Sequence, residues 1–183
     1  RPADPAELDT MRAVVAEARP YVGAQAAIVS LAKGIEQGTL RRMTEVIAEE
    51  LADHDPDRIG VLTGPNLARE VAAGQPTASV VAVPDAGVAE ELQRVFFAPT
   101  LRVYTNPDVV GCEMAGALKN VLAIGAGIAD GLGYGDNTKA ALMTRGLAEL
   151  ARLGIALGGD PMTFAGLAGM GDVRGSLTTR SLL

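Results

Sequence analysis

The chain has 183 residues, of which 48% are apolar and 21% charged, and it carries a formal net charge of −6. This composition predicts a globular protein of one domain or of two incomplete ones, and an acidic balance without a basic run argues against nucleic acid as a partner. One histidine, His54, is too few for a histidine-based metal site, and one cysteine, Cys112, excludes an internal disulfide framework and fits a reducing compartment.

The first half of the chain predicts helices and strands in alternation. Apolar residues at helical spacing predict the helices, and short continuous apolar runs predict strands that are buried on both faces. The expected helices span residues 7–18, 39–51, 66–73 and 86–97, and the expected strands span residues 26–31, 58–63, 78–83 and 101–105. Strands that alternate with helices indicate a parallel or mixed sheet joined by crossover connections.

The pattern changes after Asp108. The remaining sequence predicts a long Gly/Ala-rich helix to about residue 128, a second helix over about 137–157, and a short helix over 163–170. We therefore expect an α/β part followed by an all-α part. The apolar run 115–128 contains Lys119 and Asn120, which predicts a poor membrane span, and the N-terminal residues lack the apolar core of a signal peptide.

Two lysines follow apolar stretches, where a solubilising surface lysine is not expected. Lys33 comes just after the predicted strand 26–31, at the edge where open α/β sheets bind ligands, and Lys119 interrupts an apolar helix. A buried ammonium needs an anionic or polar partner, or its pKa falls. The alternatives are a structural role for Lys33 and a Lys119 side chain that extends along the helix to reach solvent.

Two turns add polar groups to this picture. Gly64, Pro65 and Asn66 follow the strand 58–63 and open a helix, and exposed N–H groups at such a turn can hold an anion or a cofactor amide. On this piece alone, a simple helix start with proline in its first turn is the favoured interpretation. Asp172 stands in a glycine-rich turn, where it could accept a substrate hydroxyl or could belong to an ordinary loop.

Several segments, taken in chain order, match one known family. The segments are VSLAKGIE at 29–36, GPNLARE at 64–70, PT at 76–77, YTNPDVVG at 104–111, GALKN at 116–120, GLGYGDNTKA at 131–140, TRGLAE at 144–149 and TFAGLAGMGD at 163–172. Each is weak alone, but the ordered set is specific and covers the chain from about residue 9 to residue 172. Together the segments resemble the bacterial NAD(P)-dependent glycerol-3-phosphate dehydrogenases.

The resemblance implies a fold and a reaction. The fold would be the second half of a Rossmann-type dinucleotide-binding domain, residues 1–107, joined to an incomplete helical substrate-binding domain, residues 108–183, with the active site in the cleft between them. The implied reaction is the reversible reduction of dihydroxyacetone phosphate by NADH or NADPH to sn-glycerol 3-phosphate, which feeds phospholipid synthesis. The family context also implies a cytoplasmic enzyme with no nucleic-acid partner and no membrane span, and homodimers are common in the family.

The resemblance also implies roles for individual residues. Lys119 matches the proton donor and acceptor at the substrate C2 oxygen, where an ammonium stabilises the alkoxide formed as hydride arrives. Lys33 matches a residue that contacts both substrate and cofactor. Asn120 and Asp172 match polar positions of the same pocket, and Asp172 would accept a hydroxyl hydrogen bond and hold Lys119 charged. The remaining matches are Gly64 and Asn66 at substrate-binding positions and Ala68 at a cofactor-binding position.

The chain departs from the family pattern at both ends. No Gly-x-Gly-x-x-Gly fingerprint precedes the unit of Lys33, and without it the cofactor pyrophosphate has no cradle. After Asp172 the family continues with a threonine and a phosphate-binding arginine, whose nearest counterparts here are Ser176 and Arg180. We therefore expect the middle portion of a dehydrogenase. The alternatives are a ketopantoate reductase or another β-hydroxyacid-type dehydrogenase, and a non-catalytic binding or dimerisation module.

Overall fold

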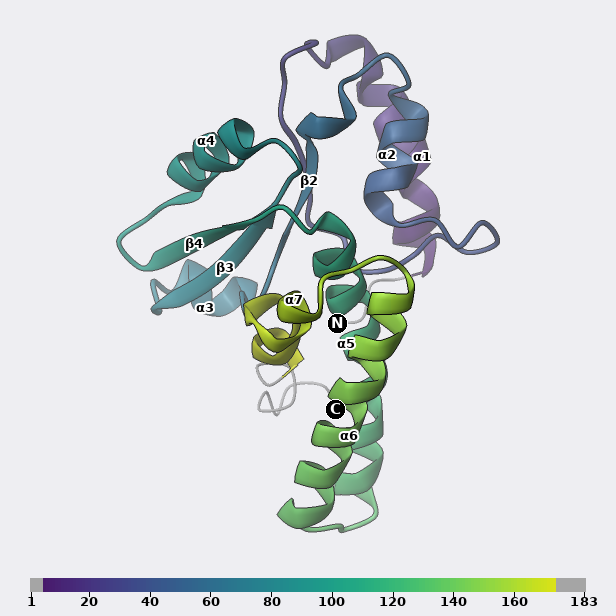
Figure 1. The fold of residues 1–183 in the computed structure, drawn as a ribbon, viewed down its shortest axis with the longest axis vertical. Helices are drawn as coiled ribbons and strands as arrows, with labels where there is room; N and C mark the ends of the chain where they lie inside the picture. The colour runs from purple at the N-terminus through teal and green to yellow at the C-terminus, as the bar shows by residue number, and fades with distance from the viewer. Residues whose placement is uncertain (1–4, 174–183) are drawn as a thin grey trace.

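The computed structural model describes residues 5–173, and their strands form one mixed sheet in the order β1-β2-β3-β4 (Figure 1). β1 (Ile28–Ser30) pairs in parallel with β2 (Ile59–Thr63), and β3 (Thr77–Ala82) pairs in parallel with β4 (Leu101–Asn106). β2 and β3 are antiparallel neighbours. The expected alternation and the mixed sheet are therefore confirmed. The sequence pattern did not say which neighbours would run in opposite directions.

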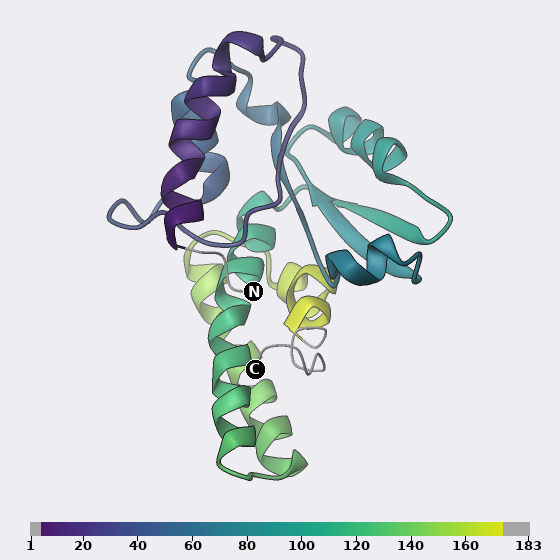
Figure 2. The same cartoon turned by 180° about the vertical axis from the view of Figure 1, so that it is seen from behind.

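Helices cover both faces of the sheet. α4 (Ala86–Phe96) is capped by Asp85, which accepts a hydrogen bond from Val88 N, and it buries Val88 and Leu92 against one face. The first turn of α5 (Val109–Gly131) and the π-helical segment η3 (Leu167–Gly171) pack against the other face. α1 (Pro5–Ala18) and α2 (Met43–Glu50) lie side by side next to β1 and β2 (Figures 1 and 2). Short elements complete this part: η1 (Arg19–Tyr21), η2 (Pro56–Arg58) and α3 (Ala68–Ala72).

The all-α part is a long helical hairpin with a short arm. α5 and α6 (Asp136–Ala156) run side by side and extend away from the sheet, while α7 (Pro161–Ala165) and η3 lie between the sheet and this hairpin (Figure 1). Asp108 connects the start of α5 with the start of α7. Its carboxylate accepts hydrogen bonds from Gly111 N at 2.7 Å and from Asp160 N at 2.8 Å. Met114, Leu150 and Phe164 form the core of this part.

Three predicted helix boundaries are wrong for local reasons. The helix expected over 39–51 begins only at Met43, because residues 36–42 form a turn in which Leu40 has a φ of 58°. The helix expected over 66–73 begins at Ala68, because Asn66 N donates back to Gly64 O. The helix expected over 163–170 is divided at Gly166 into α7 and η3.

α5 is the one helix of the described residues that is long and apolar enough to cross a membrane by length and composition alone. The mean hydropathy of its apolar 18-residue stretch is 1.3, and half of that stretch is buried inside the protein. Core helices of soluble proteins pass the same test, so the hydropathy of α5 is no argument for a membrane span.

The close packing of α6 on α7 depends on Gly154. A Cβ at Gly154 would overlap the ring of the buried Phe164. We expect Gly154→Ala to lower the free energy of unfolding by about 1–3 kcal/mol, as over-packing of a core does. Chemical denaturation measures the change. The matched control is Gly127→Ala on the same hairpin, where nothing lies within 4 Å and the alanine should stabilise the helix by up to about 1 kcal/mol. Equal stability of the two variants would contradict the packing argument.

Candidate active site

Lys33 lies just past the end of β1, at the sheet edge where β2 also ends. The chain turns there because Ser30 Oγ accepts a hydrogen bond from Ala32 N. β1 and β2 are parallel, so their carboxyl ends meet at the same edge, and Lys33 Nζ lies 3.4 Å from Gly64 O. Lys33 Nζ also forms an ion pair with Asp172 Oδ2 at 2.7 Å. The Lys33 side chain is 24% exposed, so part of it faces solvent.

Lys119 approaches the same carboxylate from α5. Its Nζ donates to Asp172 Oδ1 at 2.5 Å, and both side chains are buried. One carboxylate from the C-terminal end of η3 therefore bridges two ammonium groups that are distant in sequence. The alternative of a Lys119 that reaches solvent is wrong, since only 7% of the residue is exposed.

Gly116 allows α5 to come this close to the end of β2. A Cβ at Gly116 would lie 3.1 Å from Thr63 Oγ1 and 3.7 Å from Lys33 Cγ. Gly116 stands one turn before Lys119, so the close approach of the helix backbone at this point brings Lys119 within reach of Asp172. In the GALKN segment, the glycine thus lets the helix approach Thr63, and the lysine supplies the charge that pairs with Asp172.

The electrostatics of the cluster favour proton transfer by Lys119. Burial is the main cause that lowers the pKa of Lys119 below its ordinary value, and the positive charge of Lys33 lowers it further. The ion pair and hydrogen bond with Asp172 act in the opposite direction and raise this pKa. A lysine with a lowered pKa gives up its proton more readily, which suits a general acid and base.

The other residues singled out in the sequence lie around this cluster. Gly64 has a φ of 119°, a conformation that favours glycine. Asn66 turns toward β3, where its Nδ2 donates to Ser79 Oγ at 3.1 Å, and Ala68 is the exposed first residue of α3. Asn120 is half-buried, and its side chain makes no hydrogen bond within residues 5–173. The structure thus brings Lys33, Gly64, Lys119 and Asp172 together, whereas the Asn66 side chain binds Ser79 and Ala68 is exposed on α3. Ser176 and Arg180 lie outside the described residues.

Two features of the site escaped the sequence analysis. The hydroxyl of Thr63 is buried without a hydrogen-bond partner in the described part of the chain, and it faces Gly116. Glu113 is buried on α5 and pairs with Arg42 at 2.8 Å. The sequence did offer one signal for Glu113, namely a charged residue in an otherwise apolar helix. It does not show which element this charge faces.

Hollows on the surface and clusters of metal-binding side chains do not mark this site. A hollow of about 450 Å³ lies on α6 around Thr144, and one of about 230 Å³ lies between Asn106 and Leu167. Neither hollow is lined by Lys33, Lys119 or Asp172. These three side chains are instead in direct contact through two ion pairs. Within residues 5–173 no group of three or more His, Cys, Asp or Glu side chains could hold a metal ion.

Two family profiles match the chain in succession. Residues 7–89 match the N-terminal part of NAD-dependent glycerol-3-phosphate dehydrogenase, and residues 108–181 match its C-terminal part. The chain belongs to the glycerol-3-phosphate dehydrogenase family. The resemblance and the Rossmann-type fold with its helical partner are confirmed, and they favour this family over the ketopantoate reductases.

Relatives and solved structures of glycerol-3-phosphate dehydrogenases agree with this assignment. The Streptomyces coelicolor enzyme is 56% identical over 164 residues, which is 90% of this chain and 48% of that protein. The Corynebacterium glutamicum enzyme is 57% identical over 89% of this chain and 49% of its own length. The crystal structure of the glycerol-3-phosphate dehydrogenase from Coxiella burnetii superposes with a TM-score of 0.86 at 39% sequence identity. The match covers 93% of this chain and 51% of the Coxiella chain. The chain therefore spans about half the length of the glycerol-3-phosphate dehydrogenases it matches.

The role of Gly116 predicts a specific interaction with Thr63. In Gly116→Ala the new methyl group must displace Thr63 Oγ1 or the stem of Lys33, so we expect a loss of about 1–3 kcal/mol in the free energy of unfolding. Removal of the hydroxyl in Thr63→Ala should recover part of that loss, and a double-mutant cycle measures the coupling. Gly125→Ala on the same helix is the control, because its Cβ would meet Leu142 at an ordinary 3.6 Å. Purely additive effects of the two substitutions would contradict this packing.

Proposed function

We propose that the whole protein catalyses the reversible NAD(P)H-dependent reduction of dihydroxyacetone phosphate to sn-glycerol 3-phosphate. The observation that carries this proposal is the buried Lys119, whose pKa is lowered mainly by burial and whose Nζ is held by Asp172 beside Lys33. Membership of the glycerol-3-phosphate dehydrogenase family supplies the substrate class. It is a proposal for the whole protein, since the chain spans about half the length of its relatives.

Lys119 would supply the proton of the reaction. When bound, the reduced nicotinamide provides the hydride for C2 of the ketone. The Lys119 ammonium beside the C2 oxygen stabilises the growing negative charge and donates its proton to the alkoxide, which leaves a neutral amine. Its lowered pKa makes that donation less costly. In the reverse direction the neutral amine accepts the hydroxyl proton.

Lys33 and Asp172 would orient Lys119 and receive the substrate. Asp172 holds the Lys119 ammonium in place through Oδ1, while its other oxygen holds Lys33. Lys33 keeps part of its side chain exposed, so it can also attract an anionic phosphate ester. We further propose Gly64, Asn66 and Asn120 as substrate-binding residues and Ala68 as a cofactor-binding residue, on the basis of their matching positions in the family.

The described residues fit one end of a dinucleotide. The buried hydroxyl of Thr63, which has no partner within residues 5–173, lies at the sheet edge beside Gly116 and Gly64 and can donate to an acceptor of a bound ligand. Lys33 reaches the same edge from the end of β1. The chain contains no Gly-x-Gly-x-x-Gly sequence, so these residues provide no glycine-rich cradle for the pyrophosphate.

Four further predictions belong to this proposal. The change from strands to helices supports a domain boundary between residues 107 and 108, since β4 ends at Asn106 and α5 begins at Val109. A single, buried cysteine, Cys112, fits the reducing conditions of a cytoplasmic location. The family context supports a role of the product in phospholipid synthesis. The family supports a homodimer, which light scattering of the purified protein would test.

Lys119→Ala tests the proposed reaction. With dihydroxyacetone phosphate as substrate, we expect kcat for NAD(P)H oxidation, followed at 340 nm, to fall by about 10²–10⁴-fold because the general acid is lost. The control Lys139→Ala removes a half-buried lysine that pairs with Asp130 on the far end of the hairpin, and its activity should be unchanged. Full activity of Lys119→Ala would overturn the assignment. An inactive wild type whose intact mass equals that of these 183 residues would favour the non-catalytic module.

The pH dependence of reduction provides a second test. Reduction needs the protonated form of Lys119, so kcat/KM should fall as the pH rises through a pKa below the ordinary lysine value of 10.5. Asp172 raises the pKa of Lys119, so Asp172→Asn should move this alkaline limb to lower pH. The control Asp130→Asn changes an exposed carboxylate on the hairpin and should leave the limb in place. An alkaline limb that stays put in Asp172→Asn would show that another group titrates.

A further inference from the structure

The buried carboxylate of Glu113 connects the all-α part to α2, away from the two lysines. Glu113 Oε1 accepts a hydrogen bond from Thr44 N at 2.9 Å. Its Oε2 accepts from Arg42 Nη1 at 2.8 Å and from Thr44 Oγ1 at 2.5 Å. The Glu113 side chain is 3% exposed, so its charge depends on these three bonds rather than on water.

Glu113 completes the start of α2. The first N–H groups of a helix have no partner within the helix, and an anion near them is favoured by the helix dipole. Glu45 accepts a hydrogen bond from Arg42 N, while Glu113 reaches over from α5 to accept one from Thr44 N. The N-terminus of α2 is thus capped in part by a residue of another helix, and the two helices hold each other in register.

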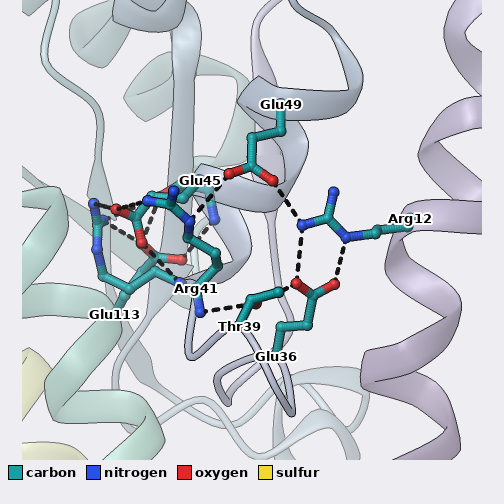
Figure 3. A network of polar contacts seen from close by, with 9 residues as sticks. Arg12, Glu36, Thr39, Arg41, Glu45, Glu49 and Glu113 are labelled. Atoms are coloured by element: carbon teal, nitrogen blue, oxygen red, sulfur yellow. Dashed lines mark hydrogen bonds and ion pairs between the residues drawn. The ribbon is translucent and has the colours of Figure 1, made fainter.

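The loop that carries Lys33 is anchored on the same segment. Glu36 N donates to Arg41 O at 2.8 Å, and the Glu36 carboxylate accepts hydrogen bonds from Arg12 at 2.6 and 2.9 Å. Figure 3 shows Arg12 between Glu36 and Glu49 on one side of this network and Glu113 on the other. Arg12, followed by the hydroxyl of Thr39, lowers the pKa of Glu36, so this carboxylate stays charged. The Lys33 loop and α5 are therefore both bound to the same segment, the start of α2.

Glu113 and Lys119 fix different sides of α5. They stand six positions apart in the sequence, which places them about 9 Å apart along the helix axis and about 120° apart around it. Glu113 holds one side of α5 on α2, and Lys119 meets Asp172 on another side. Two contacts on different sides fix both the rotation of the helix and its position along its axis.

We propose that Glu113 is a positioning residue that, through Arg42 and Thr44, sets the place of Lys119 Nζ against Asp172 and Lys33. Its consequence for the reaction rate depends on the proposed dehydrogenase function. Its consequence for the surroundings of Lys119 does not depend on that function, so the two can be tested separately.

Glu113→Gln keeps the size of the side chain and an acceptor for Thr44 N but removes the charge that pairs with Arg42. The first readout is competitive trace acetylation of lysine amines as a function of pH, followed for each peptide by mass spectrometry. We expect the neutral Lys119 amine to be labelled several-fold faster at the alkaline plateau, because it is more accessible. Its apparent pKa should move closer to 10.5, because burial is the main cause of its lowered value. Lys139, whose side chain is 33% exposed on the far end of the hairpin, is the internal reference.

Two control variants separate this effect from charge loss and from general destabilisation. Glu149→Gln removes an exposed carboxylate that pairs with Arg145 and Arg152 on α6, and Lys119 should be labelled as in the wild type. Gly154→Ala over-packs α6 against Phe164 and destabilises the protein without removing a hydrogen bond of Glu113, and it should also leave the pKa of Lys119 unchanged. If Glu113→Gln does not fold, Thr44→Val removes one of the three bonds and should give a smaller change in the same direction.

Activity gives the second readout. We expect Glu113→Gln to lower kcat by about tenfold or more with little change in KM, because a misplaced proton donor slows the chemical step. Glu113→Asp, which keeps the charge, should recover part of kcat. Wild-type labelling and labelling pKa of Lys119 in every folded variant at positions 113 and 44 would overturn the inference, whatever the activity. Increased labelling in a protein that never reduces dihydroxyacetone phosphate would support the positioning and overturn the dehydrogenase.

Discussion

The arrangement of the site depends on one buried carboxylate, that of Asp172. Two ammonium groups placed close together and largely out of water repel each other, and a buried charge without a partner is strongly destabilising. Asp172 meets both needs, because each of its oxygens accepts from a different lysine. This single residue therefore links the loop after β1, the helix α5 and the π-helical segment η3, which are far apart in the sequence.

A second set of charges, in which the carboxylates are buried, ties the Lys33 loop and α5 to α1 and α2. Arg12 binds Glu36 in the Lys33 loop, and Glu113 on α5 binds Arg42 and Thr44 at the start of α2. The ion pairs of the outer hairpin, such as those of Glu149, are exposed and contribute little to stability. Burial makes the difference, since a buried pair tolerates few geometries and so specifies how the elements meet.

Much of the fold followed from local patterns, and the errors came where long-range contacts act on the backbone. The alternation of strands and helices and the change of type after Asp108 were predicted, because burial on one or two faces imposes a period on the sequence. The start of α2 was misplaced, because the turn at Leu40 is held by Glu36 and its contacts with Arg12 and Arg41. The direction of β3 relative to β2 was left open, since an apolar strand has the same pattern in either orientation.

The sequence by itself determined the family, the types of the elements and the two lysines, because ordered motifs and charges in apolar segments are visible without a structure. Only the tertiary structure decided that Lys33 and Lys119 share Asp172, that Gly116 lets α5 approach Thr63, and that Glu113 faces α2. The physical reason is that a side chain's partner depends on how helices and strands pack. A carboxylate at a given position can be solvated or can bind two cations, and its neighbours in space decide which.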